Sequence, residues 1–199
     1  MALTKSGKIY LALHGETELN VAACAQGRCD SPLTERGRRE GASIGAKLRE
    51  MGIVARRFVS SPLGRCCATA AIIAACMDFP PSRVSTDPRL DEVSLGAWEG
   101  LSDQEIRRRW PAEMKDTTEF DWYFRAPGGE RVADVQNRLS AWLADQPADD
   151  DLIVVGHGIS SRLLRGLYAD LPIERALQLD VDRDAVFILA ERDITKVKP

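Results

Sequence analysis

The chain contains only two histidines, and both stand in the same local setting. His14 and His157 each follow a short apolar segment that predicts a buried strand, and each is followed directly by a glycine, Gly15 or Gly158. A single histidine after a strand is most often a hydrogen-bonded structural residue. Two of them in matching positions instead favour a shared site, because glycine allows a sharp turn and the close approach of a ligand.

Two charged residues complete the candidate site. Arg65 lies in the first turn of a predicted helix, since Ser61 followed by Pro62 is typical of a helix start. Glu92 lies in a predicted loop, where most glutamates are solvated. Ligands of parallel α/β sheets bind at the carboxyl ends of the strands. We therefore expect both charged residues and both histidines at one edge of the sheet.

These residue types fit phosphoryl transfer. A neutral imidazole can attack phosphorus and carry the phosphoryl group covalently. An arginine and the helix N-termini that follow Ser61 and Gly158 would stabilise the negative charge of that group. A carboxylic acid would protonate the leaving oxygen. Zinc is a weaker interpretation, because two histidines without a cysteine or carboxylate at ligand spacing fall short of a metal site.

Strand patterns alternate with helical patterns along the chain. This predicts an α/β fold, a three-layer domain with a mostly parallel central sheet flanked by helices. The expected strands cover residues 8–13, 57–60, 83–87, 152–155 and 185–189. The expected helices cover residues 32–51, 61–76, 102–110 and 130–143, with a last helix from 159. Ser102 and Glu105 predict a capping box at the start of the third of these helices. No linker divides the chain, so residues 1–199 are expected to form one domain, with a lid or cap segment around 101–130.

The composition narrows the class of protein. The net charge of −3 argues weakly against nucleic acid as the main partner. The longest uncharged stretch, around 68–77, is about half as long as a bilayer crossing requires. The five cysteines form no CxxC pair and no secretory segment opens the chain, so we interpret them as reduced thiols of a cytoplasmic protein.

Several residues have two interpretations. Cys66 and Cys67 stand beside Arg65, where a lowered thiol pKa is conceivable, but small core residues are the more common outcome. Four aromatic side chains could line a substrate mouth or pack inside a core or lid. They are Trp98, Trp110, Trp122 and Tyr123.

The segment Leu11-Ala-Leu-His14-Gly-Glu-Thr-Glu-Leu-Asn20 resembles the opening Arg-His-Gly motif of the histidine phosphatase superfamily, also called phosphoglycerate mutase-like. Later segments resemble further motifs of that family and follow in the family's order: 27–37, 60–70, 90–100, 127–130 and 155–158. Because the resemblance spans nearly the whole chain, it is more specific than any one motif. It implies a phosphoglycerate mutase-like fold and a histidine mechanism with no metal or cofactor required.

The resemblance also implies a role for each matching residue. His14 would be the nucleophile and Glu92 the general acid and base, which sets Glu92 apart from an ordinary loop glutamate. His157 and Arg65 would hold the phosphoryl group. The further phosphate-binding residues are expected to be Asn20, Gly15, Gly158 and Arg28.

One position departs from the family motif. Where the motif has arginine directly before the nucleophile, this chain has Leu13. A charge-assisted hydrogen bond contributes about 1.5–3 kcal/mol. Its loss from the transition state would slow the reaction about ten- to a hundred-fold. Leu13 could be a strand-end residue that joined the core in a weakened or non-catalytic relative. Alternatively, another arginine such as Arg28 or Arg131 occupies the vacated volume.

Three functions are compatible with these residues. The first is hydrolysis of small phosphomonoesters through a phosphohistidine at His14, which the compact chain favours. The second is phosphoglycerate mutase-type phosphoryl transfer, and the third is binding of a phosphorylated ligand without turnover. A small phosphorylated molecule is the expected partner, with neither nucleic acid nor a membrane, and exposed aromatic residues in the lid could serve a homodimer.

Overall fold

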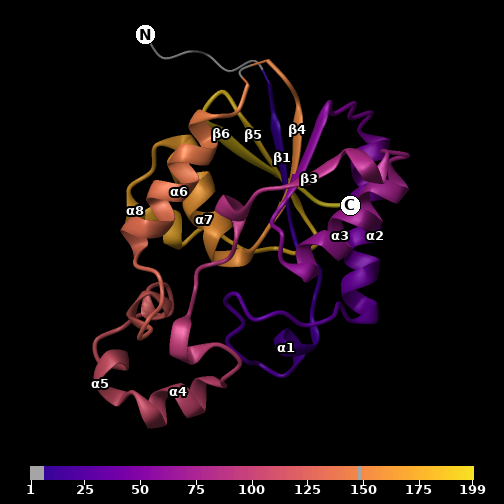
Figure 1. Ribbon diagram of the computed structural model, residues 1–199. Helices are drawn as coiled ribbons and strands as arrows, with labels where there is room; N and C mark the ends of the chain where they lie inside the picture. The colour runs from indigo at the N-terminus through magenta and orange to yellow at the C-terminus, as the bar shows by residue number, and fades with distance from the viewer. Residues whose placement is uncertain (1–6, 148) are drawn as a thin grey trace.

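The computed structural model describes residues 7–147 and 149–199. Its strands are β1 (Ile9–Leu13), β2 (Arg57–Ser60), β3 (Val84–Thr86), β4 (Leu152–Gly156), β5 (Val186–Ala190) and β6 (Asp193–Val197). They form one sheet with the strand order β3-β2-β4-β1-β5-β6 (Figure 1). All five strands expected from the sequence are present, and β6 is additional.

The sheet is mostly parallel, as predicted. β1 pairs in parallel with β4, β4 with β2, and β2 with β3. β1 also pairs antiparallel with β5, and β5 with β6, so one edge of the sheet is antiparallel. The predicted fold class, a mostly parallel central sheet flanked by helices, is confirmed.

The expectation that residues 185–189 form the last strand is wrong, because β6 follows β5 in a tight hairpin. Glu191 and Arg192 make the turn with φ angles of 50° and 65°. Such two-residue turns normally contain Asn-Gly or a related pair, so the sequence carries no turn signal here. β6 is also polar and largely exposed, as edge strands commonly are, and it lacks the apolar pattern of the other strands.

Eight α-helices accompany the sheet in the described part of the chain. They are α1 (Glu18–Val21), α2 (Glu35–Glu50), α3 (Gly64–Cys76), α4 (Asp103–Arg109), α5 (Pro111–Met114), α6 (Val132–Ala144), α7 (Gly158–Ala169) and α8 (Ile173–Leu177). Short 3-10 turns occur at Pro81–Arg83, Pro88–Leu90, Gly96–Trp98 and Trp122–Arg125. The helices α1, α5 and α8 were not predicted; each has five residues or fewer, too few to show a helical period.

The starts of two helices test the predicted caps. Ser102 and Glu105 form the predicted capping box at the start of α4. At α3 the prediction is wrong, because the helix begins at Gly64 and the residue in the cap position is Leu63, which has no side-chain hydrogen bond. The Ser61 hydroxyl is engaged elsewhere, as described below.

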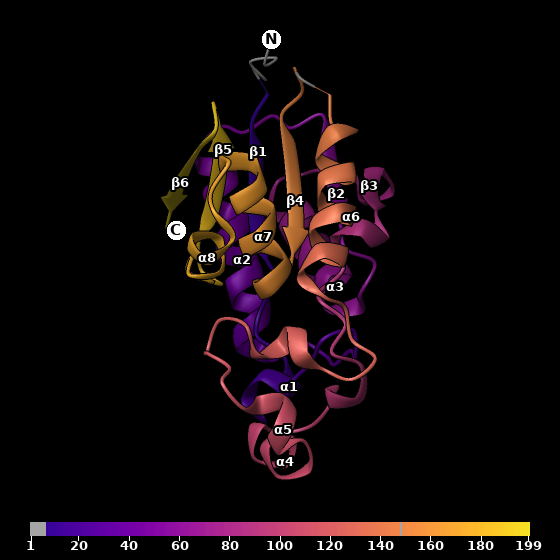
Figure 2. The ribbon, with the colours of Figure 1, turned by 90° about the vertical axis from the view of Figure 1, so that its left-hand side faces the viewer.

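Helices cover both faces of the sheet (Figure 2). α2 and α3 lie on one face, and α6 and α7 lie on the other. Alternate residues of β1 point to opposite faces: Leu11 packs into the cluster that contains the α6 and α7 side chains, and Tyr10 into the cluster that contains those of α2 and α3. All residues of β1 are buried, which explains its continuous apolar sequence.

Residues 96–131 form an extension beyond the carboxyl end of β4, and it carries α4 and α5 (Figures 1 and 2). Trp98 is fully buried there. It stacks on Trp122 with 5.8 Å between ring centroids and lies 6.3 Å from Trp110. These aromatic side chains therefore pack in the core of the extension. A role of the extension as a lid stays a prediction.

Candidate active site

The sheet register brings the two histidines together. β1 and β4 are parallel neighbours with Leu13 opposite Gly156, so the residues that follow, His14 and His157, leave the sheet side by side. Their ring centroids lie 5.3 Å apart. The backbone N–H of His14 also donates to the carbonyl oxygen of Gly156 at 3.0 Å. Both side chains are buried, and the site therefore lies at the edge that the sequence indicated.

His14 is held as a neutral imidazole with a defined tautomer. Burial, and after it the charge of Arg65, lowers the pKa of His14 to about 3. Its Nδ1 lies 2.8 Å from the carbonyl oxygen of Gly15. Because a carbonyl oxygen only accepts, the ring donates through Nδ1–H and keeps its lone pair on Nε2. Nε2 is therefore the nitrogen that can act as a nucleophile.

His157 belongs to a hydrogen-bonded chain that ends on a carboxylate. The Ser61 hydroxyl donates to Asp91 Oδ1 at 2.8 Å and accepts from the backbone N–H of Leu63 at 3.3 Å. Its second acceptor position faces Nε2 of His157, 2.8 Å away, so His157 donates through Nε2–H. Burial, and after it the charge of Arg65, holds the pKa of His157 well below its usual range.

Ser61 and Asp91 are site residues that the sequence analysis missed. The Ser-Pro pair predicted a helix cap at Ser61, whereas the hydroxyl orients a histidine. The only signal for Asp91 was its position directly before Glu92. Cys66 packs against the same imidazole, with its Sγ 3.3 Å from Nε2 of His157. Burial raises the pKa of this thiol, which agrees with the interpretation of Cys66 as a core residue.

The Arg65 guanidinium is buried and is held by the segment before α2. It donates to the carbonyl oxygens of Gly27 at 2.7 Å and Cys29 at 2.9 Å. It also forms an ion pair with Asp30 at 3.2 Å. Its Nε has no acceptor among the described residues. A fixed cation whose Nε–H is free to donate suits an anionic group beside the histidines.

The Glu92 carboxylate is bound to the N-terminus of α7. Its Oε1 accepts from the backbone N–H of Ser160 at 2.8 Å and from that of Val93 at 3.0 Å. Its Oε2 accepts from the backbone N–H of Ile159 at 3.0 Å. These contacts fix the orientation of the buried carboxyl group. They fill both acceptor positions of Oε1 and leave one open on Oε2.

The helix N-termini that the sequence analysis assigned to phosphate hold carboxylates of the chain itself. At α7, the backbone N–H groups of Ile159 and Ser160 bind Glu92. At α3, the backbone N–H of Arg65 donates to Asp30 Oδ1 at 3.2 Å. Helix N-termini attract anions, as the prediction assumed, but here the anions are internal. Binding of a phosphoryl group would therefore depend mainly on side chains.

The two glycines beside the histidines have different structural roles. A Cβ on Gly15 would lie 2.2 Å from the carbonyl oxygen of Gly37 in α2, so only glycine fits. This close approach joins two backbone segments, which differs from the expected approach of a ligand. A Cβ on Gly158 would lie 3.7 Å from Val181, an ordinary contact distance. A small side chain would therefore fit at position 158.

Asn20 and Arg28 both follow β1. Asn20 forms a capping box with Thr17: its Oδ1 accepts from the Thr17 backbone at 3.1 Å, and its own N–H donates to the Thr17 hydroxyl at 3.3 Å. Arg28 donates from Nε to the carbonyl oxygen of Glu92 at 3.5 Å and forms an ion pair with Glu130 at 3.1 Å. Arg28 thus lies beside Glu92 with its charge paired. Phosphate binding by Asn20 and Arg28 stays a prediction.

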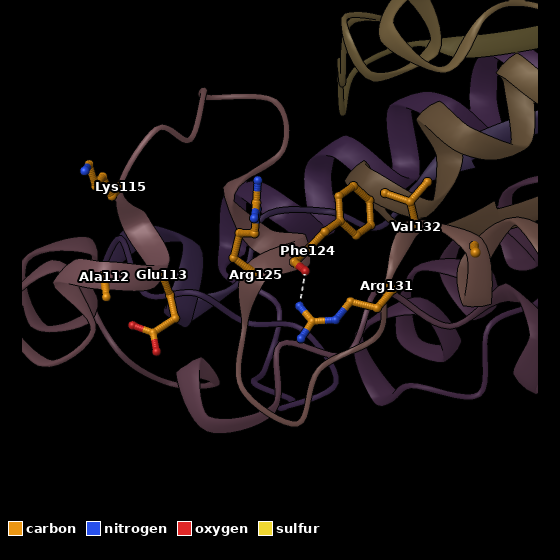
Figure 3. A pocket seen from close by; sticks show the side chains of 8 residues that line it. Ala112, Glu113, Lys115, Phe124, Arg125, Arg131 and Val132 are labelled. Atoms are coloured by element: carbon orange, nitrogen blue, oxygen red, sulfur yellow. Dashed lines mark hydrogen bonds between the residues drawn. The ribbon is translucent and has the colours of Figure 1, made fainter.

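Leu13 is 3% exposed and packs in the core cluster of the α6 and α7 layer. This agrees with the interpretation that the strand-end residue joined the core. Arg131, one of the two arginines considered as its replacement, lines a separate hollow of about 580 Å³ in the extension. Figure 3 shows its guanidinium donating to the carbonyl oxygen of Phe124, at 2.5 Å. The described residues that line this hollow include neither histidine. Arg131 therefore lines the hollow and not the histidine site.

The fold and the site together define the class of protein. A mixed sheet lies between two helical layers, and paired histidines follow adjacent parallel strands beside a buried arginine and an anchored glutamate. The chain belongs to the histidine phosphatase superfamily. The family described as "Histidine phosphatase superfamily (branch 1)" matches residues 9–196.

Named relatives include both mutases and phosphatases. A protein of Proteus mirabilis (strain HI4320) named "Probable phosphoglycerate mutase GpmB" is 36% identical over 178 residues, which is 86% of this chain and 80% of the relative. Bacillus stearothermophilus YhfR superimposes with a TM-score of 0.79 at 32% identity, covering 92% of this chain and 90% of that one. A mycobacterial glucosyl-3-phosphoglycerate phosphatase in complex with VO3 superimposes with a TM-score of 0.72 at 27% identity, covering 92% of each chain.

Proposed function

We propose that this chain is a phosphatase that hydrolyses small phosphomonoesters through a phosphohistidine at His14. The observation that carries the proposal is the state of His14, a buried neutral imidazole with its lone pair on Nε2. This nucleophile lies beside His157 and within the electrostatic reach of Arg65. Members of the superfamily are phosphatases or mutases acting on phosphorylated substrates, so the proposal specifies which of the two.

In the first step, Nε2 of His14 attacks phosphorus and the bond from phosphorus to the ester oxygen breaks. The protonated form of Glu92 gives its proton to that oxygen, and the alcohol leaves. Oε2 of Glu92 is the atom for this proton, because it keeps an open position while Oε1 accepts two backbone hydrogen bonds. In the second step, Glu92 takes a proton from water, which attacks phosphorus and releases phosphate and free His14.

Arg65 and His157 stabilise the phosphoryl oxygens during both steps. The Arg65 guanidinium offers the Nε–H that no other described group uses. Ser61 holds His157 in one orientation, so its imidazole does not have to reorganise when the charge develops. The anionic phosphoryl group would also raise the pKa of His157 and favour its protonated form.

A mutase is the second candidate function. It is favoured by the 36% identity to proteins named "Probable phosphoglycerate mutase GpmB" in Proteus mirabilis and Yersinia pestis. A mutase would return the phosphoryl group from His14 to another oxygen of the substrate and release no phosphate. Interconversion of 2- and 3-phosphoglycerate without phosphate release would therefore replace the phosphatase proposal with this one.

One finding bears on the location of the chain. None of the helices in residues 7–147 and 149–199 combines the length and the apolar character that crossing a bilayer requires. A cytoplasmic location, predicted from the cysteines, stays a prediction, as do the independence from metal and the homodimer. A binding protein without turnover would bind phosphate at this site and release none from any ester.

The proposed function is tested by measuring phosphate release from a panel of phosphomonoesters without added metal. We expect the parent protein to release phosphate and His14→Ala to lower kcat/KM at least about a thousand-fold, because the nucleophile is removed. Arg175→Ala, which changes an exposed residue on α8, is the control and should keep the parent activity. Turnover by His14→Ala at the parent rate would refute the mechanism.

A further inference from the structure

The loop between α8 and β5 brings an arginine to the edge of the sheet where His14 lies. β5 runs antiparallel to β1, beside it in the sheet (Figure 2), and Val186 is opposite Ala12. The segment before Val186 therefore enters the sheet beside the end of β1, the strand that His14 follows. Arg183 lies in the turn three residues before Val186, and it is half-buried there.

The same loop also borders the other side of the site. Val181 is the nearest neighbour of Gly158: a Cβ at position 158 would lie 3.7 Å from Val181 Cγ1 and 3.9 Å from Glu92 Oε2. The loop thus passes from the N-terminus of α7, beside the Glu92 carboxylate, to the region of His14. It therefore borders the site, which no family motif in the sequence indicated.

Charge pairing within the loop leaves Arg183 available. Its acidic neighbours are turned towards lysines near the C-terminus: Asp182 pairs with Lys198 at 2.8 Å, and Asp184 pairs with the same lysine at 3.4 Å. Asp180 pairs with Lys196. In the described part of the chain, Arg183 forms no ion pair with a carboxylate.

The positive charge of Arg183 acts on His14, the proposed nucleophile. Together with burial and the charge of Arg65, it lowers the pKa of His14. Arg28 and Arg131 are less suited than Arg183 to bind an anion at His14. The guanidinium of Arg28 is paired with Glu130, and that of Arg131 is bound to a carbonyl oxygen in the separate hollow.

We propose that Arg183 supplies the phosphoryl-binding cation that the family motif carries at the position of Leu13, and that its guanidinium binds oxygens of the phosphoryl group at His14. This inference rests on the proposed function, since it assigns a further residue to the same site. The cation comes from a different strand connection, so Leu13 can pack in the core without loss of a positive charge from the pocket. Loss of one such charge-assisted contact weakens binding about ten- to a hundred-fold.

The test compares Arg183→Gln with the parent and with Arg175→Gln, a control at an exposed arginine on the nearby helix α8. Two quantities are measured: kcat/KM for p-nitrophenyl phosphate, and the dissociation constant of orthovanadate, which imitates the phosphoryl group in transfer. We expect Arg183→Gln to worsen both about ten- to a hundred-fold, Arg183→Lys to recover part of the loss, and Arg175→Gln to match the parent. Parent-like values for Arg183→Gln would overturn the proposal.

A second pair of variants tests directly whether Arg183 replaces an arginine at position 13. Leu13→Arg should bring no gain to the parent, because the pocket already has its cation, but should restore activity and vanadate affinity in the Arg183→Gln background. If Leu13→Arg fails to fold, the comparison of Arg183→Gln with Arg183→Lys still decides. If the parent binds vanadate but hydrolyses no ester, the phosphatase proposal fails, while a loss of vanadate affinity in Arg183→Gln still supports Arg183. A parent that binds no vanadate overturns both.

Discussion

The edge of the sheet that carries the histidines and the hollow in the extension are built in opposite ways. At the edge, His14, His157 and Glu92 are buried, and each is fixed by hydrogen bonds to the backbone or to a neighbouring side chain. In the hollow, Lys115 and Arg125 are exposed. The edge suits chemistry, which needs preorganised groups. We infer that the extension serves the choice of substrate.

The comparison predicts that even a residue without contact to the substrate is important at the edge. Ser61→Ala removes the partner of His157 Nε2 and leaves Asp91 without its hydroxyl donor. We expect kcat to fall about ten- to a hundred-fold and the free energy of unfolding to fall by about 1–3 kcal/mol, because buried polar groups lose their partners. Steady-state kinetics and urea unfolding measure the two effects. Parent-like kcat for Ser61→Ala would show that this chain does not position His157 for catalysis.

The burial of both histidines predicts a loss of stability in acid. Their pKa values are lowered in the folded protein, to about 3 for His14, whereas an unfolded chain has histidine pKa values near about 6.5. The unfolded state therefore binds more protons below about pH 6.5. Stability is fully present above that pH and is lost as the pH falls towards 3. At pH 5 the change at His14 should lower the free energy of unfolding by about 2 kcal/mol, and His157 lowers it further in the same direction.

Urea unfolding at pH 7.5 and pH 5 measures this effect, and His14→Gln serves as its control. The variant cannot take up the proton at position 14, so its stability should fall less between the two pH values than that of the parent. An equal fall in parent and variant would mean that His14 is not buried as a neutral group.

The smallest effects are expected in the hollow. Replacing Lys115 and Arg125 with alanine should change kcat/KM for p-nitrophenyl phosphate by less than about fivefold, since exposed charges contribute about 0–1 kcal/mol. For larger phosphorylated substrates that extend towards the extension, the same variants should alter the order of preference. A loss with p-nitrophenyl phosphate as large as that of Ser61→Ala would end the distinction between the two regions.

Much of the edge could be predicted from the sequence because it depends on local signals. Each histidine follows an apolar strand, and the carboxyl ends of neighbouring parallel strands must meet. The position of Arg65 early in α3 was correct even though the cap was not Ser61. The capping box of Ser102 and Glu105 could also be predicted, because it joins residues only three positions apart.

The remaining features depend on contacts that no local pattern encodes. Arg183 lies near His14 because β5, which follows it, pairs with β1 although the two strands are far apart in the sequence. The turn at Glu191 and Arg192 has positive φ angles without glycine or asparagine, so no turn signal in the sequence predicted β6. Gly15 must be glycine because the backbone of Gly37, 22 residues further along, approaches it. Such contacts appear only once the elements have packed.

The central claim is that His14 carries the phosphoryl group during turnover. Its most direct test is to mix the protein with p-nitrophenyl phosphate, quench rapidly in alkali, which preserves phosphohistidine, and locate the added phosphoryl group by peptide mass spectrometry. The account predicts a phosphoryl group on the peptide that contains His14, its absence in His14→Ala, and none on the peptide that contains His157. Turnover with an unlabelled His14, or a label on His157 instead, would contradict it.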